Sequence, residues 1–313
     1  MRNRRALAAA SPGVSGPTET QFTFVALPDT QQDNSSQTRY QDHFLNRMQW
    51  IVANRSALNI KYMVQNGDLV DWDDETHSHY VRADAGLDVL DAAGFPYALS
   101  IGNHDTAAVM YGGSAAPGNV NTNLRNSSTF NTYFPLSRFS NIAGVYETGK
   151  VDNAYRFFSA AGLNFMVMNI EFCPRAGVNT WANNVIAAHP NHNVIIVTHY
   201  YLEGNGAVST SNAGYGDTSA QTFYNTAIRP NANVKFVFSG HVGTWASSIS
   251  TSSVTGHKTY NILDCWHDYN SNPTRVCTFN IPAGTVTSQV FDPKSSTWRA
   301  GTNANFSGIQ WVT

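Results

Sequence analysis

Short apolar runs in the first third of the chain alternate with helical patterns, and each apolar run ends in a polar or glycine-containing turn. Gln21 to Leu27, Lys61 to Gln65 and Tyr97 to Ile101 have the composition and length of strands. The apolar spacing between them predicts amphipathic helices at Thr38 to Asn54 and Tyr80 to Ala93. Alternating strands and helices at this spacing indicate βαβ units, and therefore an α/β fold.

The rest of the chain continues with strands, two further helices and two long loops. Glycine-rich stretches at Thr106 to Tyr133 and Glu203 to Gly216 lack a helical or strand period, and loops of such length are often functional. We expect one domain over residues 21–313, in which two packed sheets carry flanking helices. The further predicted elements are helices at Thr180–Ala188 and Ser219–Ile228 and strands at Tyr155–Phe158, Phe165–Ile170, Val194–Val197, Val234–Phe238, Thr259–Leu263, Val276–Ile281 and Val286–Phe291.

Composition excludes several classes of protein. The net charge of −2 and the absence of a basic stripe argue against binding to a nucleic-acid backbone. No apolar stretch approaches the roughly 20 residues that a membrane-spanning helix needs. Only 13% of the residues are charged, and Asn, Ser, Thr and Gly are abundant instead, as in many secreted proteins. The oligomeric state is left open.

The N-terminal residues permit two interpretations. Arg2, Arg4 and Arg5 precede Ala6 to Ala10, which resembles the start of an export signal. The apolar part is shorter than the roughly 7–15 residues of a complete signal. Residues 1–20 are therefore expected to be either a signal remnant or a disordered tail outside the fold. A secreted or extracytoplasmic location is the favoured interpretation, and a cytoplasmic one is the alternative.

Three cysteines are too few for a disulfide scaffold. Cys265 and Cys277 could pair in an oxidising compartment, or could be two buried thiols. Cys173 is expected to be a small core residue. None of the three has an evident metal-ligand spacing, and His267 is expected to be a surface group.

Polar side chains of the kinds that bind metal ions follow five of the predicted strands. Asp29, Asp68, Asn103, His199 and His241 each lie just beyond an apolar run. In open α/β sheets, ligands bind outside the carboxyl ends of the strands. Carboxylate, amide and imidazole groups from five separate loops therefore predict a metal site at one edge of the sheets.

These residues belong to short motifs that occur in a defined order over residues 22–243. The motifs are Asp29-x-Gln31, Gly67-Asp68-x-x-Asp71, Gly102-Asn103-His104-Asp105, His199 and Gly240-His241-x-Gly243. In kind and order they resemble the motifs of the calcineurin-like metallophosphoesterases. The resemblance implies a four-layer α/β/β/α sandwich of two mixed sheets with flanking helices. It also implies hydrolysis of phosphate mono- or diesters at two divalent metal ions.

The chain departs from the family pattern at Gln31 and Gly243, where the family has histidine. In the family, both of these imidazoles bind the same metal ion. The resemblance implies that one site is intact, with the bridging Asp68 and with Asn103, His199 and His241. The other site is then depleted, with Asp29, Asp68 and the amide oxygen of Gln31.

The two sites are expected to prefer different ions. Two nitrogen and two oxygen ligands suit Zn²⁺, Fe or Mn²⁺ at the intact site. An all-oxygen depleted site would favour Mn²⁺, Mg²⁺ or Ca²⁺ and bind them more weakly. A substitute ligand, either Asp33 or a residue of a long loop, is the alternative.

The resemblance also assigns roles to His104 and Asp105. His104 would face the substrate and protonate the leaving group or stabilise the developing charge, while Asp105 would hydrogen-bond the ring and set its tautomer. The implied reaction is attack of a metal-bound hydroxide on a small phosphoester substrate. The changes at Gln31 and Gly243 support an alternative, a catalytically weak single-metal protein that binds phosphate or a sugar phosphate.

Overall fold

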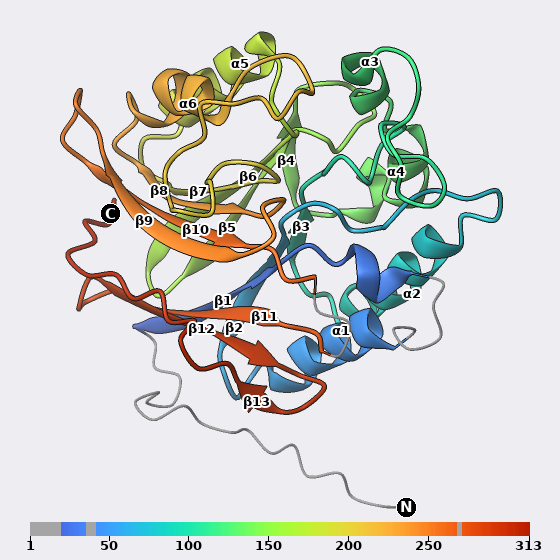
Figure 1. Ribbon diagram of the computed structural model, residues 1–313. Coiled ribbons are helices and arrows are strands. Elements are labelled where there is room, and N and C mark those ends of the chain that lie inside the picture. Colours follow the sequence, from blue (N-terminus) through green and yellow to red (C-terminus); the bar gives the residue numbers. More distant parts are fainter. Residues whose placement is uncertain (1–19, 36–41, 268–270) are drawn as a thin grey trace, which may run out of the picture.

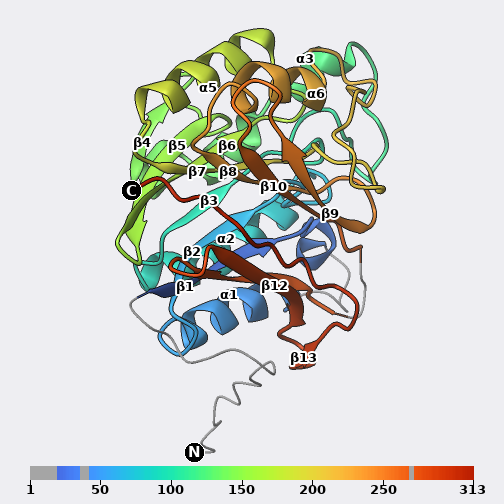
Figure 2. The same cartoon turned by 90° about the vertical axis from the view of Figure 1, so that its left-hand side faces the viewer.

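Two β-sheets lie face to face, and helices cover their outer surfaces (Figures 1 and 2). The structure is a computed structural model, and it describes residues 20–35, 42–267 and 271–313. The arrangement is the predicted α/β/β/α sandwich. Of the predicted tail at residues 1–20, all but Thr20 lies outside the described residues, so both the tail and export of the protein stay predictions.

The first sheet has six strands. In spatial order they are β13 (Thr297–Trp298), β12 (Thr285–Asp292), β11 (Thr274–Asn280), β1 (Gln21–Leu27), β2 (Ile60–Gln65) and β3 (Tyr97–Leu99). Strands β1, β2 and β3 are parallel, whereas β11 pairs with β1 in the antiparallel sense. The turns after the three parallel strands therefore lie at the same edge of the sheet.

The second sheet has seven strands and is also mixed. Its spatial order is β4 (Ile142–Val145), β5 (Ala154–Ala160), β6 (Leu163–Ile170), β7 (Asn193–Thr198), β8 (Val234–Ser239), β10 (Lys258–Asp264) and β9 (Trp245–Thr251). Strands β6, β7, β8 and β10 run parallel to one another. Strand β9 lies at the edge and pairs with β10 in the antiparallel sense.

Helices pack on the outer face of each sheet because each presents an apolar side to it. Phe44 and Met48 of α1 and Leu87 of α2 are buried against the first sheet, and Val178 and Ile186 of α5 are buried against the second. The helices are α1 (His43–Asn54), α2 (Ser78–Ala92), α3 (Val120–Leu124), α4 (Ser128–Tyr133), α5 (Ala176–Ala188) and α6 (Ala220–Phe223), which continues into a π-helical turn (Tyr224–Ile228). Among the described residues, none of the helices has both the length and the apolar character needed to cross a bilayer.

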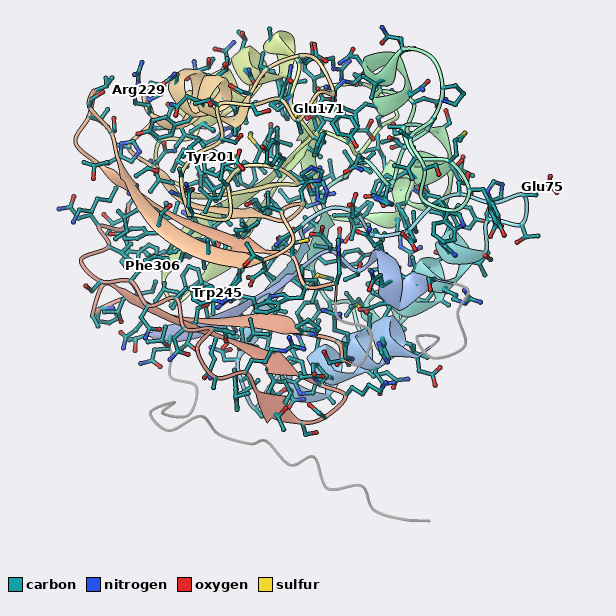
Figure 3. All side chains as sticks on the ribbon, viewed as in Figure 1. Glu75, Glu171, Tyr201, Arg229, Trp245 and Phe306 are labelled. Carbon is teal, nitrogen blue, oxygen red and sulfur yellow. The ribbon has the colours of Figure 1, made fainter. Side chains whose placement is uncertain are left out.

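Aromatic side chains fill the space between the sheets. Phe24 of β1 stacks on Phe238 of β8 with ring centroids 5.4 Å apart, and Tyr62 of β2 stacks on Phe158 of β5 at 4.9 Å. Figure 3 shows Phe306 at the side of this layer, where it is buried in the same cluster. Aromatic pairs of this kind add to the stabilisation from burial of apolar area.

Some elements differ from the predictions made from sequence. The stretch from Thr106 to Tyr133 was expected to lack regular structure, but it contains the short helices α3 and α4. These helices are polar on most sides, so they leave no apolar period; the Asn119 side chain caps α3 by accepting a hydrogen bond from the Thr122 amide. The pattern also missed β4 and the serine-rich edge strand β9. Cys173, Cys265 and Cys277 are buried free thiols, which agrees with the second of the two interpretations for the pair.

A buried ion pair also joins the two sheets. Arg275 of β11 donates to both carboxylate oxygens of Asp264 at the end of β10, with N–O distances of 2.6 and 2.7 Å. Both side chains are almost completely inaccessible to solvent. Removing one member of such a pair leaves the other charge buried without compensation.

We therefore predict that Arg275→Met lowers the free energy of unfolding by about 3–5 kcal/mol, measured by urea denaturation. The double variant with Asp264→Leu should recover much of this loss, because it removes both buried charges. Lys61→Met, at an exposed position of β2 in the same sheet, is the control and should stay within about 0.5 kcal/mol of the parent. An Arg275→Met midpoint equal to that of the control would contradict the prediction.

Candidate metal centre

Five of the six predicted metal-binding residues lie in turns that directly follow parallel strands. Asp29, Asp68 and Asn103 follow β1, β2 and β3 of the first sheet, and His199 and His241 follow β7 and β8 of the second. Because the sheets face each other, both sets of turns meet at one end of the sandwich. Asp68 and Asn103 are buried there, as is His199.

One cluster consists of Asp68, His199 and His241, whose ligand atoms all lie within 4.8 Å of one another. The Nε2 atom of His199 lies 3.1 Å from Asp68 Oδ2 but makes no hydrogen bond among the described residues. The other ring nitrogen, Nδ1, lies 3.0 Å from the Asn66 carbonyl oxygen. Donation from Nδ1–H to that carbonyl leaves the Nε2 lone pair directed at the cluster, the tautomer of a metal ligand.

Electrostatics in this cluster also suit a cation. Burial opposes ionisation of Asp68, but His199, His104 and His241 outweigh it and hold the pKa of Asp68 below its usual range. Burial likewise disfavours the charged form of His199, yet the Asp68 and Asp29 carboxylates raise the pKa of His199 to about 9. Buried carboxylates that favour a protonated imidazole would also favour a divalent ion bound in place of that proton.

Two buried amide oxygens near this cluster also lack a partner. Oδ1 of Asn103 and Oε1 of Gln31 accept no hydrogen bond from the residues that the structure describes. Next to Asn103, the His104 amide donates to Asp68 Oδ1 at 3.0 Å, so this turn lies directly on the Asp68 carboxylate. An unpartnered buried acceptor is costly, and a metal ion would satisfy it. The residues present therefore fit the metal that the resemblance implies.

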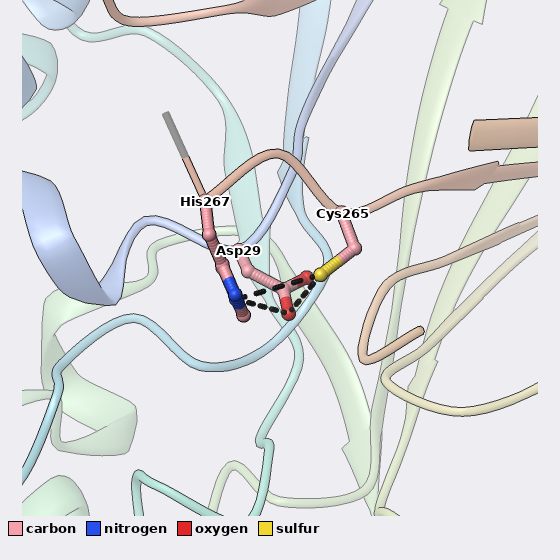
Figure 4. Close-up of side chains that lie close together, drawn as sticks. All are labelled: Asp29, Cys265 and His267. Carbon is pink, nitrogen blue, oxygen red and sulfur yellow. Dashed lines mark hydrogen bonds and ion pairs between the residues drawn. The ribbon is translucent and has the colours of Figure 1, made fainter. Parts of the chain in front are cut away.

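A second cluster consists of Asp29, Cys265 and His267 (Figure 4). The Cys265 thiol donates to Asp29 Oδ2 at 3.0 Å and lies 3.5 Å from Nε2 of His267. Burial and the Asp29 carboxylate raise the pKa of the thiol well above its usual range. His267 is exposed, as expected, but it and the buried Cys265 thiol lie beside Asp29, where the sequence had predicted only oxygen ligands. A Cys-x-His pattern directly after an apolar strand was a signal that could have marked Cys265 and His267 as candidate ligands, although not their approach to Asp29.

The two clusters adjoin each other through Asp29. The backbone N–H of His241 contacts both carboxylate oxygens of Asp29, at 3.2 and 3.1 Å. Gly240 makes this approach possible, because a Cβ atom there would lie 2.0 Å from Asp29 Oδ1. The carboxylate of Asp29 thus contacts His241 of the first cluster and Cys265 of the second.

His104 lies beside the clusters, but Asp105 does not hold it. In the described part of the chain, the Asp105 carboxylate accepts hydrogen bonds from the amides of Gly102 and Val70, at 2.8 and 3.0 Å, and none from His104. Nδ1 of His104 instead contacts the backbone oxygen of Asp71 and lies 3.6 Å from its carboxylate. Asp105 is next to His104 in sequence, but its carboxylate instead joins the turns that contain Gly102 and Val70. Asp71, rather than Asp105, therefore contacts the His104 ring.

Gln31 and Asp33 have different surroundings. Nε2 of Gln31 lies 3.5 Å from Nε2 of His104, so this side chain reaches the edge of the clusters. Asp33 forms an ion pair with Arg47, and His43 lies 3.8 Å from it. Asp33 is thus already neutralised and does not join either cluster among the described residues.

The two predicted long loops meet next to the first cluster. Nδ2 of Asn121 donates to the Tyr215 carbonyl oxygen at 3.1 Å, which joins one loop to the other. Phe172 and Tyr200 contact the ring of His241, with centroids 4.9 and 5.1 Å away. These contacts form an aromatic wall beside the imidazole. Tyr201, by contrast, is a fully buried core residue (Figure 3).

Comparison with known proteins identifies the family. A family model described as calcineurin-like phosphoesterase matches residues 22–244, more than half of the chain. The chain belongs to the calcineurin-like phosphoesterase family. The match includes all the motifs named above, and it ends before Cys265 and His267 of the second cluster.

Two individual proteins are similar to this calcineurin-like phosphoesterase. The uncharacterized protein YvnB of Bacillus subtilis (strain 168) is 29% identical over 228 residues, which are 72% of this chain and 16% of the relative. The chain thus spans about a sixth of that relative. The crystal structure of a dimetal phosphatase from Danio rerio superposes with a TM-score of 0.59 and 13% identity, covering 91% of this chain and 98% of the other. At that identity the likeness shows the fold alone.

We predict that Gly102→Ala disrupts the first cluster. A Cβ atom at Gly102 would lie 2.1 Å from Asp68 Oδ1 and 2.4 Å from the Asp68 backbone nitrogen. Relieving this overlap must move the carboxylate, so bound metal should fall and stability should drop by about 1–3 kcal/mol. Elemental analysis and thermal unfolding test both effects.

Gly243→Ala is the matched control, because a Cβ atom there meets nothing within 4 Å. It should leave metal content and stability unchanged. Equal metal content in the two variants would refute the prediction.

Proposed function

We propose that this chain hydrolyses small phosphate mono- or diesters with two divalent metal ions bound at the end of the sandwich. Metal-dependent phosphoester hydrolysis is the general activity of its family. The observation that carries the proposal is the convergence of Asp68, His199 and His241 within 4.8 Å of one another, directly beside His104. A purely structural site would have no need of an unligated imidazole at its edge.

We assign the metal ligands as follows. Asp68, Asn103, His199 and His241 would hold one ion. Asp29, Asp68 and the amide oxygen of Gln31, which has no hydrogen-bond partner among the described residues, would contribute to the other. When bound, such ions polarise the phosphoryl group, activate water as the nucleophile and stabilise the charge on the leaving oxygen. The buried position of Asp68 and His199 keeps these ligands ordered before substrate arrives.

His104 is assigned to the leaving group. The contact of Nδ1 with the Asp71 backbone oxygen fixes the ring and leaves Nε2 facing the clusters, where Gln31 is its neighbour. When the ring carries a proton on both nitrogens, Nε2 can give one to the leaving oxygen or donate a hydrogen bond to the phosphoryl group. Asp71 is thereby a positioning residue for His104, and Asp105 stabilises the turn on which His104 lies.

The surroundings favour a substrate of low charge. Arg125, from the first long loop, lies 2.9 Å from Asp217 and 3.4 Å from Glu171, so its charge is already compensated. Neither long loop has a cluster of basic residues. Phe172 and Tyr200 instead offer aromatic surface next to His241. A small or singly charged phosphoester fits these features better than a polyphosphate does.

The direct test is hydrolysis of an aryl phosphomonoester and an aryl phosphodiester by purified protein with added Mn²⁺ or Zn²⁺. Turnover that disappears with a chelator and returns with metal would support the proposal. Tight binding of inorganic phosphate without turnover of either ester would overturn it in favour of a binding protein.

We predict that His104→Ala reduces kcat about 10²–10⁴-fold, the usual contribution of general acid–base catalysis. Metal content should be unchanged, because His104 is not assigned as a ligand. His192→Ala is the control, since His192 precedes β7 at the opposite end of the sandwich, and it should keep the parent rate. Loss of metal from His104→Ala would show that the assignment is wrong.

A further inference from the structure

We propose that Cys265 and His267 complete the second metal site with Asp29, in place of the two imidazoles that the family pattern has at Gln31 and Gly243. The site would then hold a borderline-soft divalent ion such as Zn²⁺ through a thiolate, an imidazole and a carboxylate. This inference deepens the proposed function, on which it rests for the presence of a second ion. It names the residues that bind that ion and the class of ion that they select.

Strand pairing brings Cys265 next to the segment in which Gly243 replaces the family's histidine. Strand β10 lies between β8 and β9, parallel to the first and antiparallel to the second. Asp264 is paired with Trp245, and the Cys265 amide donates to the Thr244 carbonyl oxygen at 2.9 Å. Cys265 is thus directly across from Thr244, the residue after Gly243. The neighbouring strand therefore supplies a donor beside the position where glycine supplies none.

The three side chains point toward one another, as Figure 4 shows. The Cys265 Sγ atom lies 3.0 Å from Asp29 Oδ2, and His267 Nε2 lies 3.7 Å from the same oxygen. All three ligand atoms lie within 4.8 Å of one another. They come from two sheets, Asp29 from the turn after β1 and the other two from the segment after β10. Sequence proximity explains the approach of Cys265 to His267, but not the approach of either to Asp29.

Burial gives this cluster an inner and an outer side. Asp29 and Cys265 are buried, whereas 40% of the His267 side chain is exposed. Exposure on one side only is what a catalytic metal site needs, because solvent or substrate must reach an open position. The unpartnered Oε1 of Gln31 supplies a further buried oxygen donor near the clusters.

The donor set decides which ion is favoured. Thiolate sulfur and imidazole nitrogen select Zn²⁺ and related ions, whereas Mg²⁺ and Ca²⁺ require oxygen ligands. The thiol must lose its proton to bind the ion, and that proton leaves to solvent. The second site is therefore expected to be a sulfur-containing site rather than a weak all-oxygen one.

The test is Co²⁺ binding to the full chain after removal of native metal. The parent should bind two Co²⁺ ions and show the near-ultraviolet thiolate-to-cobalt charge-transfer band. Cys265→Ala should bind one ion and lose the band, and His267→Ala should also lose the second ion. Cys277→Ala, which removes a buried thiol from the core between the sheets, is the matched control and should keep both ions and the band.

A second experiment restores the second site with a histidine at position 243, where the family pattern has one. Gly243→His in the Cys265→Ala background adds an imidazole where a Cβ atom meets nothing within 4 Å. This double variant should regain the second ion without regaining the charge-transfer band. His267→Ala changes a partly exposed side chain, so it still tests the site if Cys265→Ala does not fold.

Two results would overturn the inference: a parent that binds two ions without the band, or a Cys265→Ala variant that still binds two. These readouts are independent of catalysis. Two bound ions with the band, in a protein that hydrolyses neither ester, would support the second site while overturning the proposed function. Hydrolysis of either ester by a parent that lacks the band would support the proposed function while overturning the sulfur-containing second site.

Discussion

Aromatic packing between the two sheets is the interaction on which the metal centre depends. Phe24 and Phe238 stack across the interface, and they lie only a few residues before Asp29 and His241. Their contact sets the separation and offset of β1 and β8, so the turns after these strands meet. The His241 amide can then reach the Asp29 carboxylate at 3.1 Å. Ligands from opposite sheets are thus held in place by the core, which is the rigid support that a preorganised site requires.

The ion pair between Arg275 and Asp264 extends this support to the second cluster. Asp264 is the last residue of β10, and Cys265 follows it directly. The buried guanidinium therefore anchors the strand end from which the thiol projects toward Asp29. A buried pair of this kind contributes little net stability compared with apolar packing, but it specifies one arrangement. Here that arrangement places sulfur, nitrogen and oxygen donors next to one another.

Elements with a strong local sequence pattern were predicted correctly, and elements with a weak pattern were missed. The strand Gln21–Leu27 was found with its correct bounds, because its aromatic and β-branched residues end at a proline-containing turn. The polar helix Val120–Leu124 and the serine-rich edge strand Trp245–Thr251 were missed, because neither buries a continuous face that would leave a period. The contact of Asp71, rather than Asp105, with His104 was missed for another reason: it is set by how two turns pack.

The sequence by itself determined the order of the motifs, the chemical types of the first cluster and their position just beyond strand ends. Periodicity and turn residues are local properties, and they are sufficient for that much. Only the tertiary structure decided that Cys265 and His267 face Asp29. That proximity depends on β10 inserting between β8 and β9, and on the packing of one sheet against the other. Such pairings join residues far apart in the chain, so no local pattern of side chains specifies them.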